Sequence, residues 1–329
     1  MASLNHLTIR YLLICSRLDD EVSNLAEKFF RKIMPTTLFL DAPQNFSFRH
    51  TVYSHGWCEL LPFRIDETNW RLSYVFAAEK MKNPVAADIS EAEGKIKIEI
   101  AANKINRKTE EKILRDVRHI LRLDDDLHEF YKFTKTQKSF DWINKENAGR
   151  LLRAPTVFED LVKTICTTNC SWSLTRKMTA NLVEKLGEEA SGGKRAFPTA
   201  EKMASVDADF YKDEIRAGYR SAYFAELAEK VASGKINPEK WLDSDKPTKD
   251  LKKEIKQIKG VGDYAAENLL KLVGRYDGLA LDSWLRSQFY KKHNAEQFCA
   301  DEKIEKHYEK FGDWRGLAIW CDMTERWFV

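Results

Sequence analysis

The residues with the clearest potential for chemistry lie from 256 to 274, in the stretch KQIKGVGDYAAENLLKLVG. Apolar side chains recur at helical spacing on both sides of a Gly-Val-Gly turn, so we expect two helices that pack on each other. Gly260 and Gly262 permit positive φ or a close approach of backbones, and Val261 can fill the gap between the helices. The N–H groups that open the second helix could hold a phosphate oxygen. A plain turn between helices is the alternative, because an isolated Gly-x-Gly pair is weak evidence for a phosphate site.

A single acid, Asp282, follows this stretch in the segment LALDSWLR. The residues after it, SWLRSQFYKK, read as a helix, and Asp282 stands where the N-cap of that helix should be. An N-cap carboxylate accepts a hydrogen bond from the first turn and contributes about 1 kcal/mol. Without further context, this structural role is the preferred interpretation of Asp282.

The elements that must position these residues fall into two parts. The first third contains a helical stretch from Glu21 to Ile33 and then strand-like runs, WCELLPFRID, WRLSYVF and KIKIEIAA, the last of which alternates as a half-buried antiparallel strand does. Helical periodicity dominates from Asn106 onward, where Thr156 and Glu159 have capping-box spacing. We therefore predict an α+β fold, with an antiparallel β-rich domain at residues 1–105 and a larger all-α domain at residues 106–329.

The composition narrows the class of protein. The chain has 329 residues, enough for two domains, and it contains no run of about 18 apolar residues that would predict a membrane span. The apolar patch at its start is too short for a signal peptide, so we expect an intracellular protein of the cytoplasm or nucleoid, or of the nucleus in a eukaryote. Its six cysteines contain no Cys-x-x-Cys pair, and neither a metal nor a cofactor is expected. The formal net charge is only +3, but residues 249–292 hold ten Lys/Arg against six Asp/Glu.

The hairpin followed by Asp282 resembles the helix-hairpin-helix plus Gly/Pro-Asp signature of the DNA glycosylase superfamily, in which an essential aspartate follows the hairpin after a short loop. The resemblance covers most of the chain, in the family's order. It extends to segments similar to those of 8-oxoguanine glycosylases and of relatives of DNA-3-methyladenine glycosylase II, namely FSFRHTVYSHGWCELLPFRID, APTVFEDLVKTICTTNCSW, AGYRSAYFAELA and WRGLAIWCDMTERW. The all-α part would then be the helix-hairpin-helix glycosylase domain.

The resemblance implies that Asp282 is the catalytic residue. Cleavage of an N-glycosidic bond develops positive charge on the sugar, and a carboxylate a few ångströms away stabilises that charge by several kcal/mol at an effective dielectric constant of roughly 20. Activation of the attacking water by the same carboxylate is a hypothesis. The catalytic role and the N-cap role are compatible.

Bifunctional members of the superfamily carry a Schiff-base lysine just after the hairpin turn, and this sequence has Tyr264 in that place. The difference favours a monofunctional hydrolase that leaves an abasic site without cutting the strand. Lys259 and Lys271 lie nearby but off register, and we interpret both as solvated or phosphate-contacting lysines. A bifunctional enzyme that uses one of them is the alternative.

The resemblance also implies contacts with the opened duplex. Asn169 in TTNCSW and the pair Tyr219-Arg220 in AGYRSAY match family positions that probe the vacated stack and the orphaned partner base. Loop polarity and ordinary packing are the alternative interpretation of these three residues. Leu174 stands where 8-oxoguanine glycosylases place an arginine toward the opposite cytosine, which puts strict pairing with cytosine in doubt.

Aromatic residues make up 12% of the chain, and several fall in segments that border the base pocket in relatives. A cationic alkylated purine would stack well on such rings through cation–π attraction. We predict Tyr264 and Trp314 as pocket residues and expect most other tryptophans in the core. His50 and His55 lack a metal-ligand pattern and are interpreted as structural, hydrogen-bonded histidines.

The resemblance thus implies a monofunctional base-excision repair glycosylase that hydrolyses the N-glycosidic bond of a flipped damaged purine, with an alkylated purine preferred to 8-oxoguanine. Its partner would be double-stranded DNA that contains a damaged base, no membrane contact is expected, and one chain suffices for the chemistry. Two alternatives stay open. One is an 8-oxoguanine glycosylase with abasic-site lyase activity, and the other is a non-catalytic DNA-binding protein that uses the hairpin as a phosphate clamp.

Overall fold

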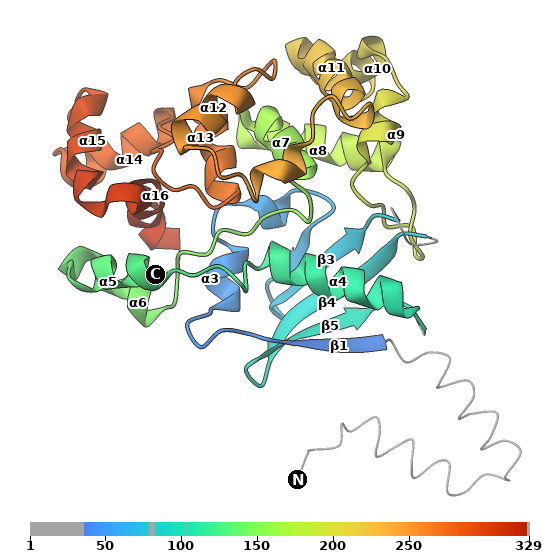
Figure 1. Ribbon diagram of the computed structural model, residues 1–329, viewed down its shortest axis with the longest axis horizontal. Coiled ribbons are helices and arrows are strands. Elements are labelled where there is room, and N and C mark those ends of the chain that lie inside the picture. Colours follow the sequence, from blue (N-terminus) through green and yellow to red (C-terminus); the bar gives the residue numbers. More distant parts are fainter. Residues whose placement is uncertain (1–35, 79–82, 103, 328–329) are drawn as a thin grey trace, which may run out of the picture.

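The computed structural model describes residues 36–78, 83–102 and 104–327, and the predicted helix from Glu21 to Ile33 lies outside them. The described chain begins with an antiparallel sheet and continues as an array of helices (Figure 1). The predicted α+β class, with a β-rich N-terminal part followed by helices, is confirmed. The domain boundary at residue 105 stays a prediction.

Five antiparallel strands form one sheet, in the order β1-β5-β4-β3-β2. The sequence of β5, KIKIEI, explains its orientation, because its three isoleucines are fully buried and the charged residues between them are more exposed. Ile98 of this strand lies opposite Leu38 and Ile89 of its two neighbours, so the apolar side chains share one face. The strands are β1 (Thr36–Asp41), β2 (Arg64–Asp66), β3 (Arg71–Phe76), β4 (Val85–Ala92) and β5 (Lys95–Ile100).

The run WCELLPFRID is a strand only at its end, in β2, and its first half is the short 3₁₀ helix η1 (Trp57–Glu59). The expectation of a strand was wrong for that half. Among its buried residues, the three large side chains of Trp57, Leu60 and Phe63 recur every three positions, which is the period of a 3₁₀ turn and not that of a strand. Turn hydrogen bonds from Leu60 N to Trp57 O and from Phe63 N to Leu60 O satisfy the backbone there.

Helix α4 (Arg107–Ile120) lies across the sheet in Figure 1 and contributes Ile113, Val117 and Ile120, all fully buried, to the same core as the sheet's isoleucines. This core continues into the C-terminal helices, which add Phe289 and Leu317. Residues near both ends of the described chain therefore share one hydrophobic core. The C-terminal helices are α14 (Ser283–His293), α15 (Asp301–Tyr308) and α16 (Arg315–Thr324).

A second core lies among the helices in the upper part of Figure 1. Apolar stripes of neighbouring helices build this core, such as Leu251 and Ile255 on one helix and Ala266, Leu269 and Leu270 on another, all almost fully buried. The helices that build it are α7 (Val157–Thr167), α8 (Trp172–Leu186), α9 (Ala200–Ala204), α10 (Ala208–Asp213), α11 (Ser221–Ala232), α12 (Thr248–Ile255) and α13 (Asp263–Leu272).

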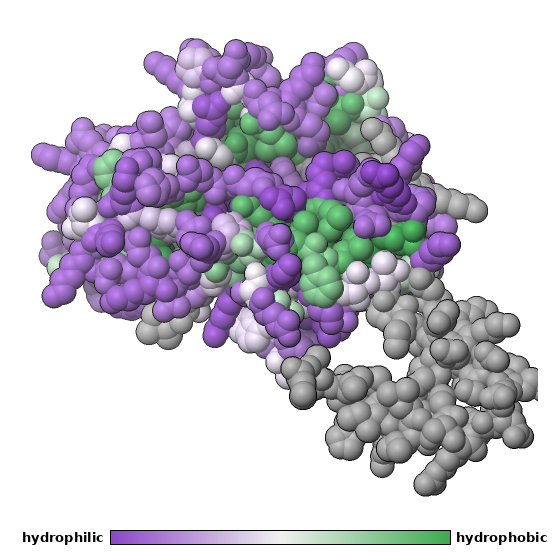
Figure 2. Space-filling view, turned by 60° about the horizontal axis from the view of Figure 1, so that its bottom comes forward, coloured by the Kyte–Doolittle hydropathy of each residue, from purple (hydrophilic) through white to green (hydrophobic). Residues whose placement is uncertain are grey.

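The remaining elements are short and connect these layers. Among the described residues, no helix has the length and apolar character that crossing a membrane requires. One face of the molecule shows hydrophobic side chains in its middle with hydrophilic ones around them (Figure 2). The short elements are α3 (Phe48–Val52), α5 (His128–Lys135), η2 (Lys138–Phe140), α6 (Asp141–Lys145), η3 (Gly218–Arg220), η4 (Pro238–Trp241), η5 (Glu309–Trp314) and η6 (Glu325–Trp327).

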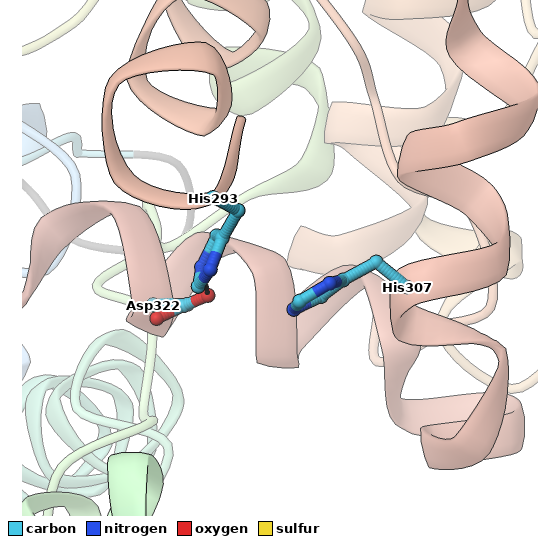
Figure 3. Close-up of side chains that lie close together, drawn as sticks. All are labelled: His293, His307 and Asp322. Carbon is cyan, nitrogen blue, oxygen red and sulfur yellow. Dashed lines mark hydrogen bonds and ion pairs between the residues drawn. The ribbon is translucent and has the colours of Figure 1, made fainter. Parts of the chain in front are cut away.

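A polar cluster ties the three C-terminal helices together (Figure 3). The buried carboxylate of Asp322 on α16 lies 2.7 Å from His293 Nε2 and accepts a 2.5 Å hydrogen bond from the Tyr308 hydroxyl. The ring of His307 lies beside that of His293, with 4.4 Å between centroids. Although His293, His307 and Asp322 offer atoms within 4.8 Å of one another, the Lys292 ammonium lies 2.7 Å from Asp322 Oδ1. Because that cation competes with a metal ion for the carboxylate, we interpret the cluster as structural.

Candidate functional site

A cavity of about 590 Å³ opens between residues 53–59, α7, α8, α13 and the C-terminal helices. This volume lies within the range of roughly 300 to 1,000 Å³ that is typical of small-molecule sites, and it has room for a purine base. Tyr264 and Asp282 both line it. Aromatic rings supply much of the wall, and its tryptophans are Trp57, Trp172, Trp284, Trp320 and Trp327.

The turn between α12 and α13 places the second helix against this cavity. Gly260 has φ +88°, and a Cβ there would lie 2.7 Å from Cδ2 of Tyr223, so this position requires glycine. Gly262 has φ −88° and no neighbour within 4 Å of an added Cβ, so the expected need for glycine applies to Gly260 alone. Val261 is buried in the helical core, as predicted.

The start of α13 already carries charge. Asp263, in the first turn of α13, lies 2.9 Å from Lys256 Nζ and 3.0 Å from Lys252 Nζ. These hydrogen bonds, first that from Lys256, hold the pKa of the Asp263 carboxyl below its usual value. A phosphate at this turn would therefore meet both lysines and one carboxylate, and DNA binding by Gly260, Val261 and Gly262 stays a prediction.

One face of α13 is turned to the cavity. Tyr264, Asn268 and Lys271 follow one another at i, i+4 and i+7, and all three line the cavity wall. Burial raises the pKa of Tyr264 to about 12, and the negative charge of the nearby Asp282 carboxylate contributes to the same rise. Tyr264 is therefore a neutral phenol at neutral pH, in the same cavity wall as the Asp282 carboxylate.

Asp282 is the N-cap of α14, as the sequence predicts. Its Oδ1 accepts a 2.7 Å hydrogen bond from the backbone N–H of Leu285, and its backbone is extended, with φ −117° and ψ −177°. The cap fixes the side chain while the carboxylate still lines the cavity. The structure thus brings Asp282 and Tyr264 together in one site.

The loop that delivers Asp282 is held by two side chains of α13. Glu267 Oε2 accepts a 2.6 Å hydrogen bond from the backbone N–H of Ala280, and Lys271 Nζ donates a 3.0 Å hydrogen bond to the backbone carbonyl of Leu279. Gly278 is needed here, since a Cβ would lie 2.8 Å from Cγ of Glu267. The position of the carboxylate therefore depends directly on α13.

The interpretation of Lys271 as a solvated or phosphate-contacting lysine was wrong. Its exposed fraction is 2%, and its Nζ lies 5.7 Å from the centroid of the Trp320 ring, inside the molecule. Burial lowers the pKa of Lys271 to about 8, against the opposing effects of Glu267 and Asp282. The sequence did contain a signal, because a lysine seven positions after Tyr264 lies on the same helical face. Lys259, in contrast, is exposed and pairs with Glu226 at 2.6 Å.

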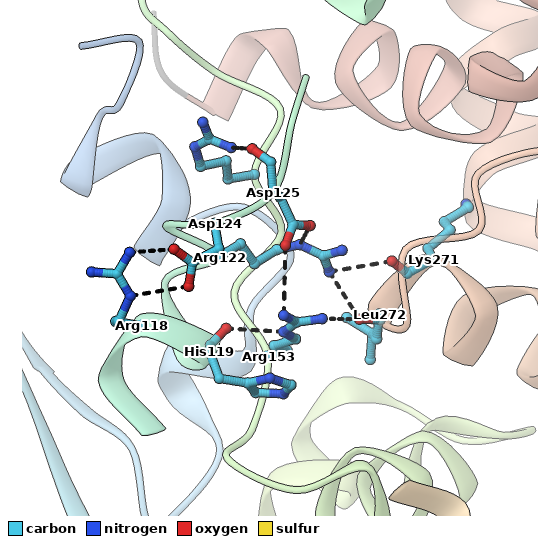
Figure 4. A network of polar contacts seen from close by, with 9 residues as sticks. Arg118, His119, Arg122, Asp124, Asp125, Arg153, Lys271 and Leu272 are labelled. Carbon is cyan, nitrogen blue, oxygen red and sulfur yellow. Dashed lines mark hydrogen bonds and ion pairs between the residues drawn. The ribbon is translucent and has the colours of Figure 1, made fainter. Parts of the chain in front are cut away.

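The other end of α13 is fixed by two arginines (Figure 4). Arg122 Nη1 and Arg153 Nη1 donate hydrogen bonds of 2.9 and 3.0 Å to the carbonyl of Leu272, and Arg122 also reaches the carbonyl of Lys271 at 3.3 Å. Asp125 lies 2.6 Å from Arg122 and 3.6 Å from Arg153 and so balances their charge. The carbonyls that a helix leaves unpaired at its C-terminus are thereby satisfied.

The three residues predicted to contact the opened duplex lie near one another but differ in exposure. Asn169 is exposed at the end of α7 with φ +47°, and Tyr219 is 54% exposed. Arg220 is buried, and its guanidinium donates hydrogen bonds to the carbonyl of Ile165 at 3.2 Å and to Thr168. The structure thus gives Arg220 a packing role that supports the loop of Asn169, while Asn169 and Tyr219 are available at the surface.

Trp314 packs away from the cavity wall that Tyr264 lines. Its ring stacks on Tyr276, with 5.3 Å between centroids and an angle of 19°, and it also contacts Phe130 at 5.6 Å. The structure therefore does not bring Trp314 together with Tyr264 and Asp282. The sequence analysis predicted Trp314 in the wall of the base pocket, and the tryptophans named above form that wall instead.

His50 and His55 are both hydrogen-bonded, as expected for structural histidines. His50 Nδ1 lies 2.8 Å from the Ser47 hydroxyl, and His55 bonds to the carbonyl of Leu152. His55 also lines the cavity, and burial lowers its pKa to about 4. Its imidazole is therefore neutral at physiological pH.

The mouth of the cavity carries a pair that the sequence did not indicate. Trp172 Nε1 donates a 3.0 Å hydrogen bond to Glu59, and its ring lies over Gly56, where a Cβ would come within 2.8 Å of the indole. This pair joins η1 to α8 across a large sequence separation, so nothing in either segment alone predicts it.

Several solved structures share this architecture. MBOgg1 in complex with a low-affinity DNA ligand aligns with a TM-score of 0.70 and 21% identity over 89% of this chain and 96% of its own. The 3-methyladenine DNA glycosylase from Archaeoglobus fulgidus gives 0.70 and 19% over 89% and 99%. The 8-oxoguanine glycosylase/lyase of Clostridium acetobutylicum, bound to DNA, gives 0.67 and 18% over 90% and 100%.

Comparisons of sequence alone add nothing to this result. No protein-family model matches the chain. No curated protein matches it either. The structural alignments show that the chain has the α+β fold found in 3-methyladenine and 8-oxoguanine DNA glycosylases.

Proposed function

We propose that this protein is a DNA glycosylase that hydrolyses the N-glycosidic bond of a damaged purine flipped into the cavity. The observation that carries the proposal is the meeting of Asp282 and Tyr264 in an aromatic cavity, within a fold whose solved examples named above are DNA glycosylases. Two of those examples were solved with DNA bound. A base must leave the duplex to reach such a cavity, at a cost that is smallest for damaged or mismatched bases.

Asp282 would stabilise the sugar as the bond breaks. The C1′–N bond breaks with its electron pair on the base, and the oxygen of water forms the new bond to C1′. The proton that water loses passes through Asp282 to solvent or, where the base departs as an anion, to the base. A carboxylate roughly 4 Å from the cationic sugar contributes about 4 kcal/mol at an effective dielectric constant of roughly 20, which corresponds to about a thousandfold in rate. Tyr264 would orient the carboxylate through its hydroxyl.

The absence of a lysine at position 264 supports hydrolysis without strand cleavage, because an amine at that place is what forms a Schiff base in bifunctional relatives. The aromatic wall supports a purine substrate, since each base face can stack on a ring. Two kinds of purine fit these rings. Cationic alkylated purines are favoured by cation–π attraction, and neutral oxidised or deaminated purines are favoured by the buried ammonium of Lys271.

The test is release of the base from duplexes that each contain one lesion, namely 7-methylguanine, 3-methyladenine, hypoxanthine or 8-oxoguanine. The native protein is compared with Asp282→Asn, which keeps an N-cap of equal quality and removes the charge. Asp313→Asn is the matched control, because Asp313 is exposed on η5. We expect nicks only after alkali treatment, lost in Asp282→Asn and kept in the control. Nicks without alkali would indicate an amine nucleophile, and binding without release of any lesion would favour the phosphate-clamp alternative.

A further inference from the structure

The ammonium group of Lys271 stands in the wall of the cavity with few partners. Its Nζ donates one hydrogen bond, to the carbonyl of Leu279 at 3.0 Å. Among the residues that the structure describes, no carboxylate lies within 4.0 Å of it and no second acceptor is seen. An ammonium group has three N–H donors, so two of them are left for a ligand.

A buried charge with so little compensation is costly, and proteins seldom keep one without a use. Glu267 and Asp282 carry the two carboxylates whose negative charges act on Lys271, and both are engaged elsewhere. Glu267 binds Lys252 and the backbone of Ala280, whereas Asp282 caps α14. The wall around the ammonium is aromatic, with Trp320 at 5.7 Å. The missing acceptors must therefore come from what fills the cavity.

We propose that Lys271 determines the substrate class of this site, by donating hydrogen bonds to an oxygen or ring nitrogen of a neutral purine lesion and by repelling purines that carry a positive charge. The inference rests on the proposed glycosylase function and narrows it. It selects neutral purines with an exocyclic carbonyl oxygen, such as 8-oxoguanine or hypoxanthine. It disfavours N-alkylated purines such as 7-methylguanine, whose ring is cationic in the nucleoside.

The same group explains how a neutral base could leave. A cationic alkylated base departs as a neutral molecule, but a neutral base departs with the electron pair of the C1′–N bond and is an anion until it is protonated. An ammonium group that hydrogen-bonds the base stabilises that negative charge as it develops. It can also pass a proton to the base, and the proton released by the attacking water restores the balance.

The experiment measures single-turnover release of 8-oxoguanine, hypoxanthine and 7-methylguanine by the native protein and by Lys271→Met, which replaces the ammonium by an apolar chain of similar length. Lys145→Met is the matched control, because Lys145 is an exposed lysine of α6, paired with Asp141. We expect Lys271→Met to lose about 100-fold in release of the neutral lesions and to lose little or to gain with 7-methylguanine. The control should change neither rate.

Lys271 also holds the loop before Asp282. The ratio of the release rates for different lesions therefore distinguishes recognition of the base from positioning of the catalytic carboxylate. An equal loss with all three lesions would assign Lys271 to positioning alone and overturn the proposal, as would a native preference for 7-methylguanine. If the native protein releases no lesion, the proposed function falls together with this inference. Native activity that is unchanged in Lys271→Met would leave the glycosylase standing and reject the role of Lys271.

A second measurement follows the pH dependence of the preference between lesions. The ionisable groups that face Lys271 are Glu267 on its own helix, Asp282 after the loop, Cys321 on α16 and His55 across the cavity. Burial raises the pKa of Cys321 to about 12 and lowers that of His55 to about 4, so neither changes charge from about pH 6 to about pH 9. Over that range the native preference for neutral lesions over 7-methylguanine should fall as the ammonium loses its proton. A preference that stays constant or rises would overturn the proposal, and dividing by the rates of Lys271→Met removes the titration of the lesions themselves.

Discussion

Replacement of Asp322 by alanine should strongly destabilise the packing of the C-terminal helices. The Asp322 side chain is fully buried, and its oxygens lie 2.7 Å from Lys292 Nζ, 2.7 Å from His293 Nε2 and 2.5 Å from the Tyr308 hydroxyl (Figure 3). Removal of one partner of a buried ion pair costs about 3 to 5 kcal/mol. Lys292 keeps a second carboxylate, Glu325, at 2.6 Å. We therefore expect a loss of about 3 kcal/mol, at the lower end of that range.

The assay is urea unfolding, in which the midpoint should fall while the slope stays constant. Tyr308→Phe is the matched variant, because it removes only the hydroxyl that donates to Asp322 and should cost about 1.5 to 3 kcal/mol. A loss below about 1 kcal/mol for Asp322→Ala would refute the reasoning. It would mean that the interactions with the three partners only offset the free energy that burial of the carboxylate costs.

The pH dependence gives an independent check. Burial alone would raise the pKa of Asp322, but hydrogen bonds from His293, Lys292 and Tyr308 hold it below its usual value. A carboxyl whose folded pKa is lowered contributes stability that is present above its unfolded pKa of about 4 and is lost as pH falls through the folded pKa. The difference in unfolding free energy between the native protein and Asp322→Asn should therefore shrink below about pH 4. A difference that grew with acid would contradict the assigned partners.

Three further predictions concern the site. Gly260→Ala should lower the free energy of unfolding by about 2 kcal/mol, because the residue has φ +88° and its added Cβ would meet a tyrosine ring, whereas Gly262→Ala should change it by less than about 1 kcal/mol; similar melting temperatures for the two would contradict the geometry. Glu267→Gln should slow base release about 10-fold with little loss of stability, because it weakens the anchor of Ala280 ahead of the catalytic loop, and an unchanged single-turnover rate would reject that anchor. Arg153→Met should cost about 2 kcal/mol in chemical unfolding, because it removes a hydrogen bond to the carbonyl of His119 and one of the two arginine donors to the carbonyl of Leu272, and a neutral result would mean that Arg122 alone holds the end of α13.

Local patterns in the sequence predicted the local parts of the site. Alternation in KIKIEI gave a strand with three buried isoleucines, and the capping residue Thr156 accepts from Glu159 N as its spacing indicated. Asp282 caps α14, and Val261 fills the turn before α13. Each of these depends on residues within about one helical turn of one another, which is the range over which sequence periodicity carries information.

The features that sequence did not predict depend on contacts between distant segments. Lys271 is buried because a loop and the Trp320 ring cover it, and Arg220 is buried because it turns back to the end of α7. Trp314 stacks on Tyr276 because η5 turns it toward the first core rather than the cavity. Both the burial of a long polar side chain and the direction of a tryptophan are decided by packing partners far away in the chain, so neither follows from local spacing.

The arginine clamp on the end of α13 has a consequence for the order in which the molecule assembles. The donors and the carbonyls they cap are separated by 119 to 150 residues, and the wall of the cavity draws on both the beginning and the end of the described chain. Contacts between such distant segments form late in folding, because the entropy of closing a large loop is lost before the contacts stabilise the chain. On dilution from denaturant, the helical circular dichroism signal should therefore return before base-release activity does. In a refolding chain, α13 would form before the cavity that it lines.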